Sequence, residues 1–346
     1  MPSGRSRRTR PVRGEFDLIR RLQAQTAKPD RQVALGIGDD TAILRTSSTE
    51  WTLITTDLLA EGVHFDLATS SCENIGYRAA IANLSDIAAM GGTPRFMLVA
   101  IAIPSTCSTT QIHQLYRGMM QASAPYRVCL VGGDTSASKH GLFLSITLTG
   151  VVRPKRALLR SGARVGDRLY VTGTLGDSRA GLDLLSARRR RHLSASHTRF
   201  LHHRHHRPSA RIAEGRWLVK HGLAGAAIDL SDGLTGDLRH ICEESSVGAE
   251  VMQGALPISP ACRAYAAAYG LSPQDIALQG GEDYELLFTV PADEQSRFEQ
   301  LAGKTPFHFT CIGTITPQRS GLRLRTEQGT TSPLPLTSYD HFRRPS

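Results

Sequence analysis

Acidic residues stand beside glycine, serine or threonine at six places along the chain. Five of these places follow apolar, β-prone runs, and the sixth lies within a helical pattern. The six motifs are Gly38-Asp39-Asp40, Thr55-Thr56-Asp57, Asn83-Leu84-Ser85-Asp86, Gly132-Gly133-Asp134, Ile228-Asp229-Leu230-Ser231-Asp232-Gly233 and Gly281-Glu282-Asp283. Aspartate and glycine are common turn formers, so one such motif alone indicates only a turn. Six in one chain predict that the carboxylates share a function.

Gathered carboxylates repel one another, and assembling them without a cation is costly. Hard oxygen ligands on short turns suit Mg²⁺, which often bridges to substrate phosphates. Phosphoryl transfer needs mainly in-line positioning and neutralisation of the transferring group. Glycines beside the acids let backbone N–H groups approach phosphate oxygens. The motifs therefore predict magnesium-dependent phosphoryl transfer. Arg160 is a candidate for the assisting positive charge, or else a surface residue of a linker.

The common nucleotide-binding motifs are absent from the sequence. Gly303-Lys304-Thr305 matches only the end of a P-loop, and the HRD and DFG motifs of protein kinases do not occur. Gly36 and Gly38 are followed by Thr41 where a dinucleotide-binding fingerprint has its third glycine. An ATP site in this chain must therefore be built on the acidic motifs.

The elements that position these motifs can be predicted from hydrophobic periodicity. Helices are expected at 15–25, 74–90, 109–123, 177–186 and 235–245. Strands are expected at 51–56, 95–103, 142–152, 168–172, 226–230 and 285–290, with a buried strand at 127–131 that runs into Gly132. The alternation predicts an α/β or α+β fold. Pro154 marks a predicted boundary between an N-terminal domain at 14–153 and a C-terminal domain at 154–346.

The net charge of +10 comes from two segments. Residues 1–13 and 188–211 hold 13 of the 41 basic residues and no acid, which leaves 28 basic against 31 acidic residues elsewhere. A solvated basic extension at 1–13 and an exposed His- and Arg-rich insertion at 188–207 are predicted, neither with a catalytic role. Nucleic-acid binding by these segments, and metal binding by the histidines at 202, 203, 205 and 206, are the alternatives.

Composition narrows the class of protein further. No apolar run reaches the length of a membrane helix, and no apolar core follows the basic start, so neither a membrane span nor a secretory signal is expected. The alternative for the start is a transit peptide. Six cysteines without a CxxC pair indicate a reducing cytoplasm rather than disulfides or zinc.

The ordered set of motifs resembles the thiamine-monophosphate kinase family over residues 14–342. Besides the acidic motifs, the resemblance is carried by Gly14-Glu15-Phe16, His64-Phe65, Ile87-Ala88-Ala89-Met90-Gly91, Arg160-Ser161-Gly162-Ala163, Val171-Thr172-Gly173-Thr174-Leu175-Gly176-Asp177-Ser178, Tyr284-Glu285-Leu286 and Tyr339-Asp340-His341-Phe342. It implies direct transfer of the ATP γ-phosphoryl group to thiamine monophosphate. It also implies a fold like that of aminoimidazole ribonucleotide synthetase, with an N-terminal ATP-binding α/β domain, a C-terminal α/β domain and dimerisation through the N-terminal sheets.

The resemblance also implies roles for individual residues. The implied magnesium ligands are Asp40, Thr55, Thr56, Asp57, Asp86, Asp134, Asp229 and Asp232, of which Asp57, Asp134 and Asp232 are the expected catalytic group. The implied ATP contacts are Tyr116, Gly133, Asp134, Arg160 and Ser231. His64 and Glu282 would contact the thiamine moiety, although His64 could instead be an ordinary core histidine.

The chain departs from the family pattern near its end. Leu336 stands where relatives often have an aromatic residue, which removes a stacking surface for a ligand ring. The nearest alternatives are other ATP-dependent enzymes of the same superfamily. Selenophosphate synthetase is expected to have a reactive Cys near its start, and the hydrogenase-maturation relative ends in Cys, whereas this chain has its first cysteine at Cys72 and ends at Ser346. A basic nucleic-acid-binding protein is the alternative from a different class.

Overall fold

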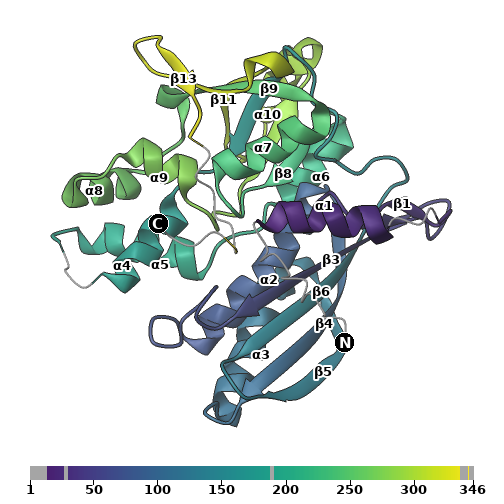
Figure 1. The fold of residues 1–346 in the computed structure, drawn as a ribbon, viewed down its shortest axis with the longest axis vertical. Helices are drawn as coiled ribbons and strands as arrows, with labels where there is room; N and C mark the ends of the chain where they lie inside the picture. Colours follow the sequence, from purple (N-terminus) through teal and green to yellow (C-terminus); the bar gives the residue numbers. More distant parts are fainter. Residues whose placement is uncertain (1–13, 27–29, 188–190, 336–341, 343–346) are drawn as a thin grey trace, which may run out of the picture.

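The structure is a computed structural model that describes residues 14–26, 30–187, 191–335 and 342. The predicted basic extension at 1–13, the residues 188–190 of the predicted insertion, and Leu336 lie outside the described residues. Two β-sheets with their helices form the lower and upper parts of the molecule in Figure 1. This arrangement is the predicted α/β (α+β) fold, and helix α1 (Glu15–Thr26) lies where the two parts meet.

The first sheet has six strands in the order β1-β2-β3-β6-β4-β5. Their bounds are β1 Val33–Leu35, β2 Ala42–Leu44, β3 Trp51–Ala60, β4 Thr93–Pro104, β5 Cys129–Ser138 and β6 Phe143–Val152. Helices α2 (Cys72–Ala89) and α3 (Thr109–Ser123) cover one face, where Leu144, Ile146 and Leu148 of β6 are fully buried. The alternate residues of β6 are only partly covered, so the sheet has one covered face and one open face.

The second sheet has seven strands in the order β13-β12-β9-β11-β7-β10-β8. Its strands are β7 Arg168–Thr172, β8 Ala227–Asp229, β9 Val247–Met252, β10 Leu286–Val290, β11 Phe309–Pro317, β12 Leu322–Arg325 and β13 Thr331–Pro333. The helices of this part are α4 Asp177–Ser186, α5 Ala195–His206, α6 Ile212–His221, α7 Leu234–Ser245, α8 Pro260–Tyr269, α9 Pro273–Gln279 and α10 Gln295–Ala302. Short 3₁₀ turns occupy η1 Ala124–Tyr126, η2 Gln253–Ala255, η3 Ala292–Glu294 and η4 Gln318–Ser320.

Two predictions about strands are wrong. β3 does not end at Asp57 but continues to Ala60, because it pairs along its whole length with β6. β5 is an exposed strand, not a buried one, and the glycines at 132 and 133 lie within it. It pairs only with β4 at the edge of the sheet, so its apolar residues are not enclosed by the described part of the chain. The Asp57 and Asp134 motifs are therefore strand segments rather than turns.

The prediction that residues 188–207 form an exposed insertion is also wrong for the residues that the structure describes. Residues 195–206 form helix α5, in which Leu201 and His205 are buried. Arg204 pairs with the buried Glu285 at 2.8 Å, and Arg207 pairs with Glu73 at 2.8 Å. Arg204 can occupy the inner face of this helix because the buried Glu285 neutralises its charge. A search for apolar periodicity alone could not find that face.

Helix α2 connects the two parts of the molecule. It packs on β3, β4 and β6 of the first sheet and also contacts β8 and α6 of the second part. Ser85 of α2 donates a hydrogen bond to Asp229 of β8 at 2.7 Å. The acidic motifs of both parts can therefore meet beside α2. Among the described residues, no helix has the length and apolar character needed to cross a membrane.

Candidate active site

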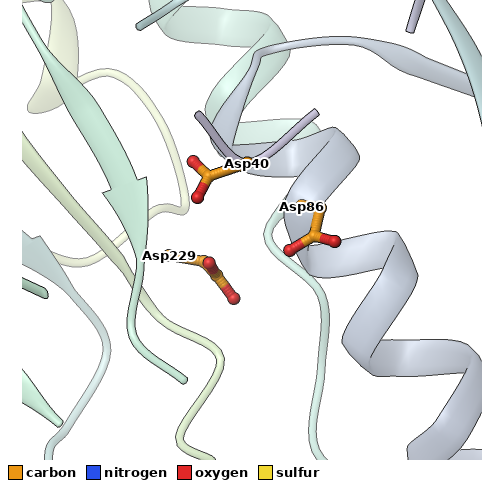
Figure 2. A group of neighbouring side chains, drawn as sticks. All are labelled: Asp40, Asp86 and Asp229. Atoms are coloured by element: carbon orange, nitrogen blue, oxygen red, sulfur yellow. The ribbon is translucent and has the colours of Figure 1, made fainter. Parts of the chain in front are cut away.

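Three carboxylates from distant parts of the sequence converge in one place. Asp40 comes from the loop before β2, Asp86 from α2, and Asp229 from the end of β8. One oxygen of each lies within 4.8 Å of the others. Figure 2 shows the three side chains pointing toward a common space between the two parts of the molecule. These are three of the predicted magnesium ligands.

The electrostatics of this carboxylate cluster (Asp40, Asp86 and Asp229, with Asp57 beside it) oppose ionisation. Burial, together with the charge of Asp40, raises the pKa of Asp229 to about 8. Burial and the charges of Asp57 and Asp229 raise the pKa of Asp86 well above its usual range. Burial raises the pKa of Asp57 to about 6. A cation at the cluster would remove this penalty by holding all four groups ionised.

The donor set fits a hard divalent cation. Oδ2 of Asp40 and Oδ2 of Asp57 are buried and have no hydrogen-bond partner among the described residues. Buried polar atoms are normally paired, and such exceptions need an explanation. Carboxylate oxygens are the ligands that Mg²⁺ prefers. These atoms are therefore suited to coordination rather than to an internal hydrogen bond.

Hydrogen bonds from neighbouring side chains, including that of Ser85 to Asp229, hold the cluster in place. The hydroxyl of Thr55 donates a hydrogen bond to Asp86. Arg160 donates to Oδ1 of Asp40 through Nε at 3.1 Å and through Nη2 at 2.5 Å. Its backbone N–H donates to Asp39 at 3.0 Å, so the linker before the second sheet is fixed to the Asp39-Asp40 loop. Burial opposes the charge of Arg160, but Asp40 outweighs it and raises the pKa of the guanidinium.

The turn after β8 brings Ser231 and Asp232 to the same region. The carboxylate of Asp237, in the first turn of α7, accepts hydrogen bonds from the N–H groups of Asp232 at 3.3 Å and Gly233 at 3.1 Å. The N–H of Glu282 donates to the carbonyl of Ser231 at 2.8 Å. The Ser231-Asp232-Gly233 turn and the Gly281-Glu282 motif are thus one connected structure.

The two residues expected to contact thiamine are linked through a buried arginine. Nδ1 of His64 accepts the N–H of Ala60 at 3.0 Å, which closes the turn after β3. Arg78 of α2 donates to the carbonyl of His64 at 3.3 Å and to the carboxylate of Glu282. His64 and Glu282 are therefore both held by Nη2 of Arg78, at the junction of the two parts.

Thr56 and Asp134 lie away from the cluster. The residues in register with Asp57 on the neighbouring strands are Ile146, Val99 and Gly133. These positions belong to the covered face of the sheet. Thr56 and Asp134 are each one residue away, so alternation places their side chains on the open face, where both are exposed. Three strand spacings, about 14 Å, also separate β3 from β5.

A pocket lies at the edge of the first sheet. Tyr116 of α3 and Gly133 and Asp134 of β5 line a volume of about 370 Å³. A Cβ atom at Gly133 would stand 1.8 Å from the carbonyl oxygen of Val99, so only glycine fits this close approach of β5 to β4. Of the predicted ATP contacts, Tyr116, Gly133 and Asp134 thus form one group, and Arg160 and Ser231 form another at the cluster.

Sequence reasoning missed several residues that shape the site. Asp39 and Ser85 stand inside the quoted motifs, so adjacency could have indicated them. Asp237 and Arg78 carry no such signal, because the contact of Arg78 with Glu282 joins residues 204 positions apart. Only the folded chain shows that these side chains support the acidic motifs.

Comparison with known proteins shows which family the chain belongs to. Residues 38–152 match the family model "AIR synthase related protein, N-terminal domain", and residues 164–325 match "AIR synthase related protein, C-terminal domain". The chain is 37% identical over 332 residues to the thiamine-monophosphate kinase of Bacillus subtilis, covering 95% of this chain and 99% of that protein. It is 39% identical over 335 residues to the corresponding kinase of Haemophilus influenzae, covering 95% and 98%.

Solved structures give the same result. The structure described as "AaThiL complexed with AMPPCP and TMP" has a TM-score of 0.83 and 34% identity, covering 97% of this chain and all of that one. The thiamine-monophosphate kinase of Stenotrophomonas maltophilia has a TM-score of 0.72 and 36% identity, covering 92% and 98%. The chain belongs to the thiamine-monophosphate kinase family of AIR synthase related proteins.

Proposed function

We propose that this chain is an ATP-dependent kinase that phosphorylates thiamine monophosphate, giving thiamine diphosphate and ADP. The observation that carries the proposal is the convergence of Asp40, Asp86 and Asp229 within 4.8 Å. Phosphoryl transfer depends on positioning and charge neutralisation, for which such a cluster is suited. The relatives that the chain matches over nearly their whole length are named for this activity. One similar structure was solved with AMPPCP and TMP.

Magnesium is the cation that we assign to the cluster. Asp40, Asp57, Asp86 and Asp229 would hold it, and Asp232 on the neighbouring turn would complete the set. The ion would supply charge neutralisation of the ATP phosphates. Thr55 orients Asp86, and Arg160 holds Asp40. That Thr56 and Asp134 are also ligands remains a prediction. They would bind metal in an assembly whose site includes the open face of the sheet.

The nucleotide would lie between the cluster and the edge of the sheet. Gly133 and Tyr116 line the pocket beside β5, and the close approach of β5 to β4 at Gly133 shapes it. Arg160 and Ser231 would face the phosphate end of the nucleotide. Asp57, Asp134 and Asp232 are the residues that we propose as catalytic. Transfer is proposed to be direct, because the chemistry needs no covalent phosphoenzyme.

The acceptor would lie beside Glu282 and His64. The thiazolium ring of thiamine monophosphate is a cation, so a carboxylate next to it would contribute favourable electrostatic energy. Glu282 is 29% exposed and can reach a ligand at the junction of the two parts. We therefore assign specificity for thiamine to this end of the site.

We further propose a homodimer built on the open face of the first sheet. This face exposes the apolar side chains of Phe96 and Leu98 on β4, and Val131 of the neighbouring edge strand β5 is also exposed. Exposed apolar groups of this kind commonly mark protein interfaces. The matching test is the oligomeric state of Val131→Arg, which is expected to be monomeric in sedimentation experiments. A cytoplasmic location and the domain boundary at 153/154 stay predictions.

Incubation with γ-labelled ATP, Mg²⁺ and thiamine monophosphate tests the proposed reaction. Label should move to thiamine diphosphate, with unphosphorylated thiamine as the control acceptor. Label that goes only to water, or equally to thiamine, would contradict the proposed acceptor. Label that remains on acid-quenched protein would contradict direct transfer.

A further inference from the structure

Arg78 is an almost fully buried cation at the centre of the molecule. Its side chain is 2% exposed, yet it lies in the middle of α2, a helix whose other buried residues are mostly apolar or small. Burial of a guanidinium is costly unless a carboxylate and hydrogen bonds compensate for it. Here burial opposes the charge, but Glu282 together with Tyr284 outweighs burial and raises the pKa of Arg78. The position of this cation therefore depends on Glu282.

The partners of Arg78 are the two residues that we assign to the acceptor. Nη2 donates both to the carboxylate of Glu282 and to the carbonyl of His64. One guanidinium thus connects the turn after β3 to the Gly281-Glu282 motif of the second part. The contact with Glu282 is a charge-assisted hydrogen bond, which is stronger than one between neutral groups.

The backbone of Glu282 adopts an uncommon conformation. Its φ of 62° lies in the left-handed region, which is uncommon for residues other than glycine. A Cβ at the preceding Gly281 would lie 2.5 Å from the carbonyl oxygen of Ser231, so the motif is pressed against that turn. Strained backbone of this kind clusters at functional sites, where the surrounding structure determines it.

Among the residues that the structure describes, the other neighbour of Glu282 with an ionisable nitrogen is a neutral histidine. Nδ1 of His205, from α5, lies 3.7 Å from the second carboxylate oxygen of Glu282 and 3.2 Å from the hydroxyl of Ser178. Burial and the nearby charge of Arg78 lower the pKa of His205 to about 2, so this ring is neutral at ordinary pH. The charged contact of Glu282 in the described structure is thus Arg78.

We propose that Arg78 is a positioning residue for the acceptor, holding Glu282 and the His64 turn in the geometry that receives thiamine monophosphate. This inference rests on the proposed function. Helix α2 makes the arrangement effective because it also carries Asp86 of the cluster. The two residues are eight positions apart, about 12 Å along a rigid helix axis. One helix thereby fixes the distance between the acceptor end and the metal end of the site.

The test compares steady-state constants of Arg78→Met, Arg78→Lys, Glu282→Gln and the double variant Arg78→Met/Glu282→Gln. Loss of a charged hydrogen bond predicts that Arg78→Met raises KM for thiamine monophosphate by about 10- to 100-fold. KM for ATP should change by less than about threefold, because Arg78→Met frees only the residues at the acceptor end of the site. Arg78→Lys should recover part of the loss. The double variant should lose clearly less than the product of the two single losses, because Arg78 acts in part through Glu282.

The matched control is Arg207→Met. Arg207 also pairs with a carboxylate on α2, Glu73, and donates to Asn74 and Gln121, but it does not touch the proposed acceptor residues. It should leave both KM values unchanged. An unchanged KM for thiamine monophosphate in Arg78→Met, or multiplicative effects in the double variant, would overturn the inference.

Two further outcomes are distinguishable. If Arg78→Met fails to fold, Arg78→Lys carries the test. It should melt close to the wild type yet show a KM for thiamine monophosphate raised at least about threefold, since the shorter and more strongly hydrated lysine ammonium does not occupy the position of Nη2. An unchanged KM there would overturn the inference. A wild-type chain that makes no thiamine diphosphate would instead overturn the proposed function itself.

Discussion

Asp57 and Asp134 lie on opposite faces of the same six-stranded sheet. Both follow small residues in similar motifs, yet Asp57 faces α2 and the carboxylate cluster, whereas Asp134 faces outward on β5. Their functions therefore depend on different surroundings. Variants at the two positions should have separable effects on metal binding and on turnover.

We expect Asp57→Asn and Asp134→Asn each to lower kcat by roughly a thousandfold or more, because each removes charge proposed to act on the transferring phosphoryl group. Only Asp57→Asn should weaken the Mg²⁺-induced rise in melting temperature of the nucleotide-free chain. Thermal unfolding with and without Mg²⁺ measures this difference. Asp293→Asn, at an exposed position in η3, is the control. Loss of the Mg²⁺ response in Asp134→Asn would show that the two faces act as one site.

The Mg²⁺ response should increase with pH. The pKa of Asp229 is raised to about 8 and that of Asp57 to about 6, both above their unfolded values. A raised carboxyl pKa costs no stability below about pH 4 and costs progressively more as pH rises toward the folded value. Mg²⁺ needs the ionised groups and removes that cost. Its stabilisation should therefore be larger near pH 8 than near pH 5.5, and an equal or smaller shift near pH 8 would contradict the assignment.

Gly133→Ala should damage the nucleotide end of the site. The added Cβ would meet the Val99 carbonyl oxygen at 1.8 Å, so β5 must move away from β4 at a cost of about 1–3 kcal/mol. We expect KM for ATP to rise at least about tenfold with little change in KM for thiamine monophosphate. Gly132→Ala is the matched control, because its Cβ would meet only a side-chain atom of Leu98 at 3.4 Å. Equal behaviour of the two variants would contradict this account.

Glu285→Gln should destabilise the second part of the molecule by about 3–5 kcal/mol. Glu285 is fully buried and accepts hydrogen bonds from Arg204, Arg211 and Thr172. Burial alone would raise its pKa, but Arg211 and Arg204 outweigh burial and lower it. Its stabilising contribution is thus complete above the unfolded value near pH 4.5 and is lost as pH falls through the lower folded value.

Urea unfolding near pH 7 measures the Glu285→Gln effect. Glu294→Gln, which breaks the exposed pair with Arg297, should cost less than about 1 kcal/mol. A comparable loss in the two variants would show that the buried network adds nothing beyond a surface pair.

The sequence predicts the regular elements well where local signals are strong. Helix α3 has its predicted bounds, and Ser108 with Gln111 forms a capping box at its start. Helix α5 was missed because its inner face is basic, and that face is stable only beside Glu285 and Glu73, which come from remote segments. The exposure of β5 was missed because strand burial depends on what covers the sheet.

The site was partly predictable for similar reasons. Carboxylates in recurring motifs indicated that Asp40, Asp86 and Asp229 meet, and the structure brings them together. The separation of Thr56 from Thr55 follows from strand alternation once β3 is known to continue past Asp57. Arg78 and Asp237 could not be found from local patterns, because their partners are set only by the tertiary fold.

The most direct test measures thiamine diphosphate formed from ATP and thiamine monophosphate by the wild-type chain and by Asp86→Asn, with and without Mg²⁺. The account predicts product from the wild type only when Mg²⁺ is present, and roughly a thousandfold less from a folded Asp86→Asn chain. Full turnover by Asp86→Asn, or turnover by the wild type in the absence of any divalent cation, would contradict it.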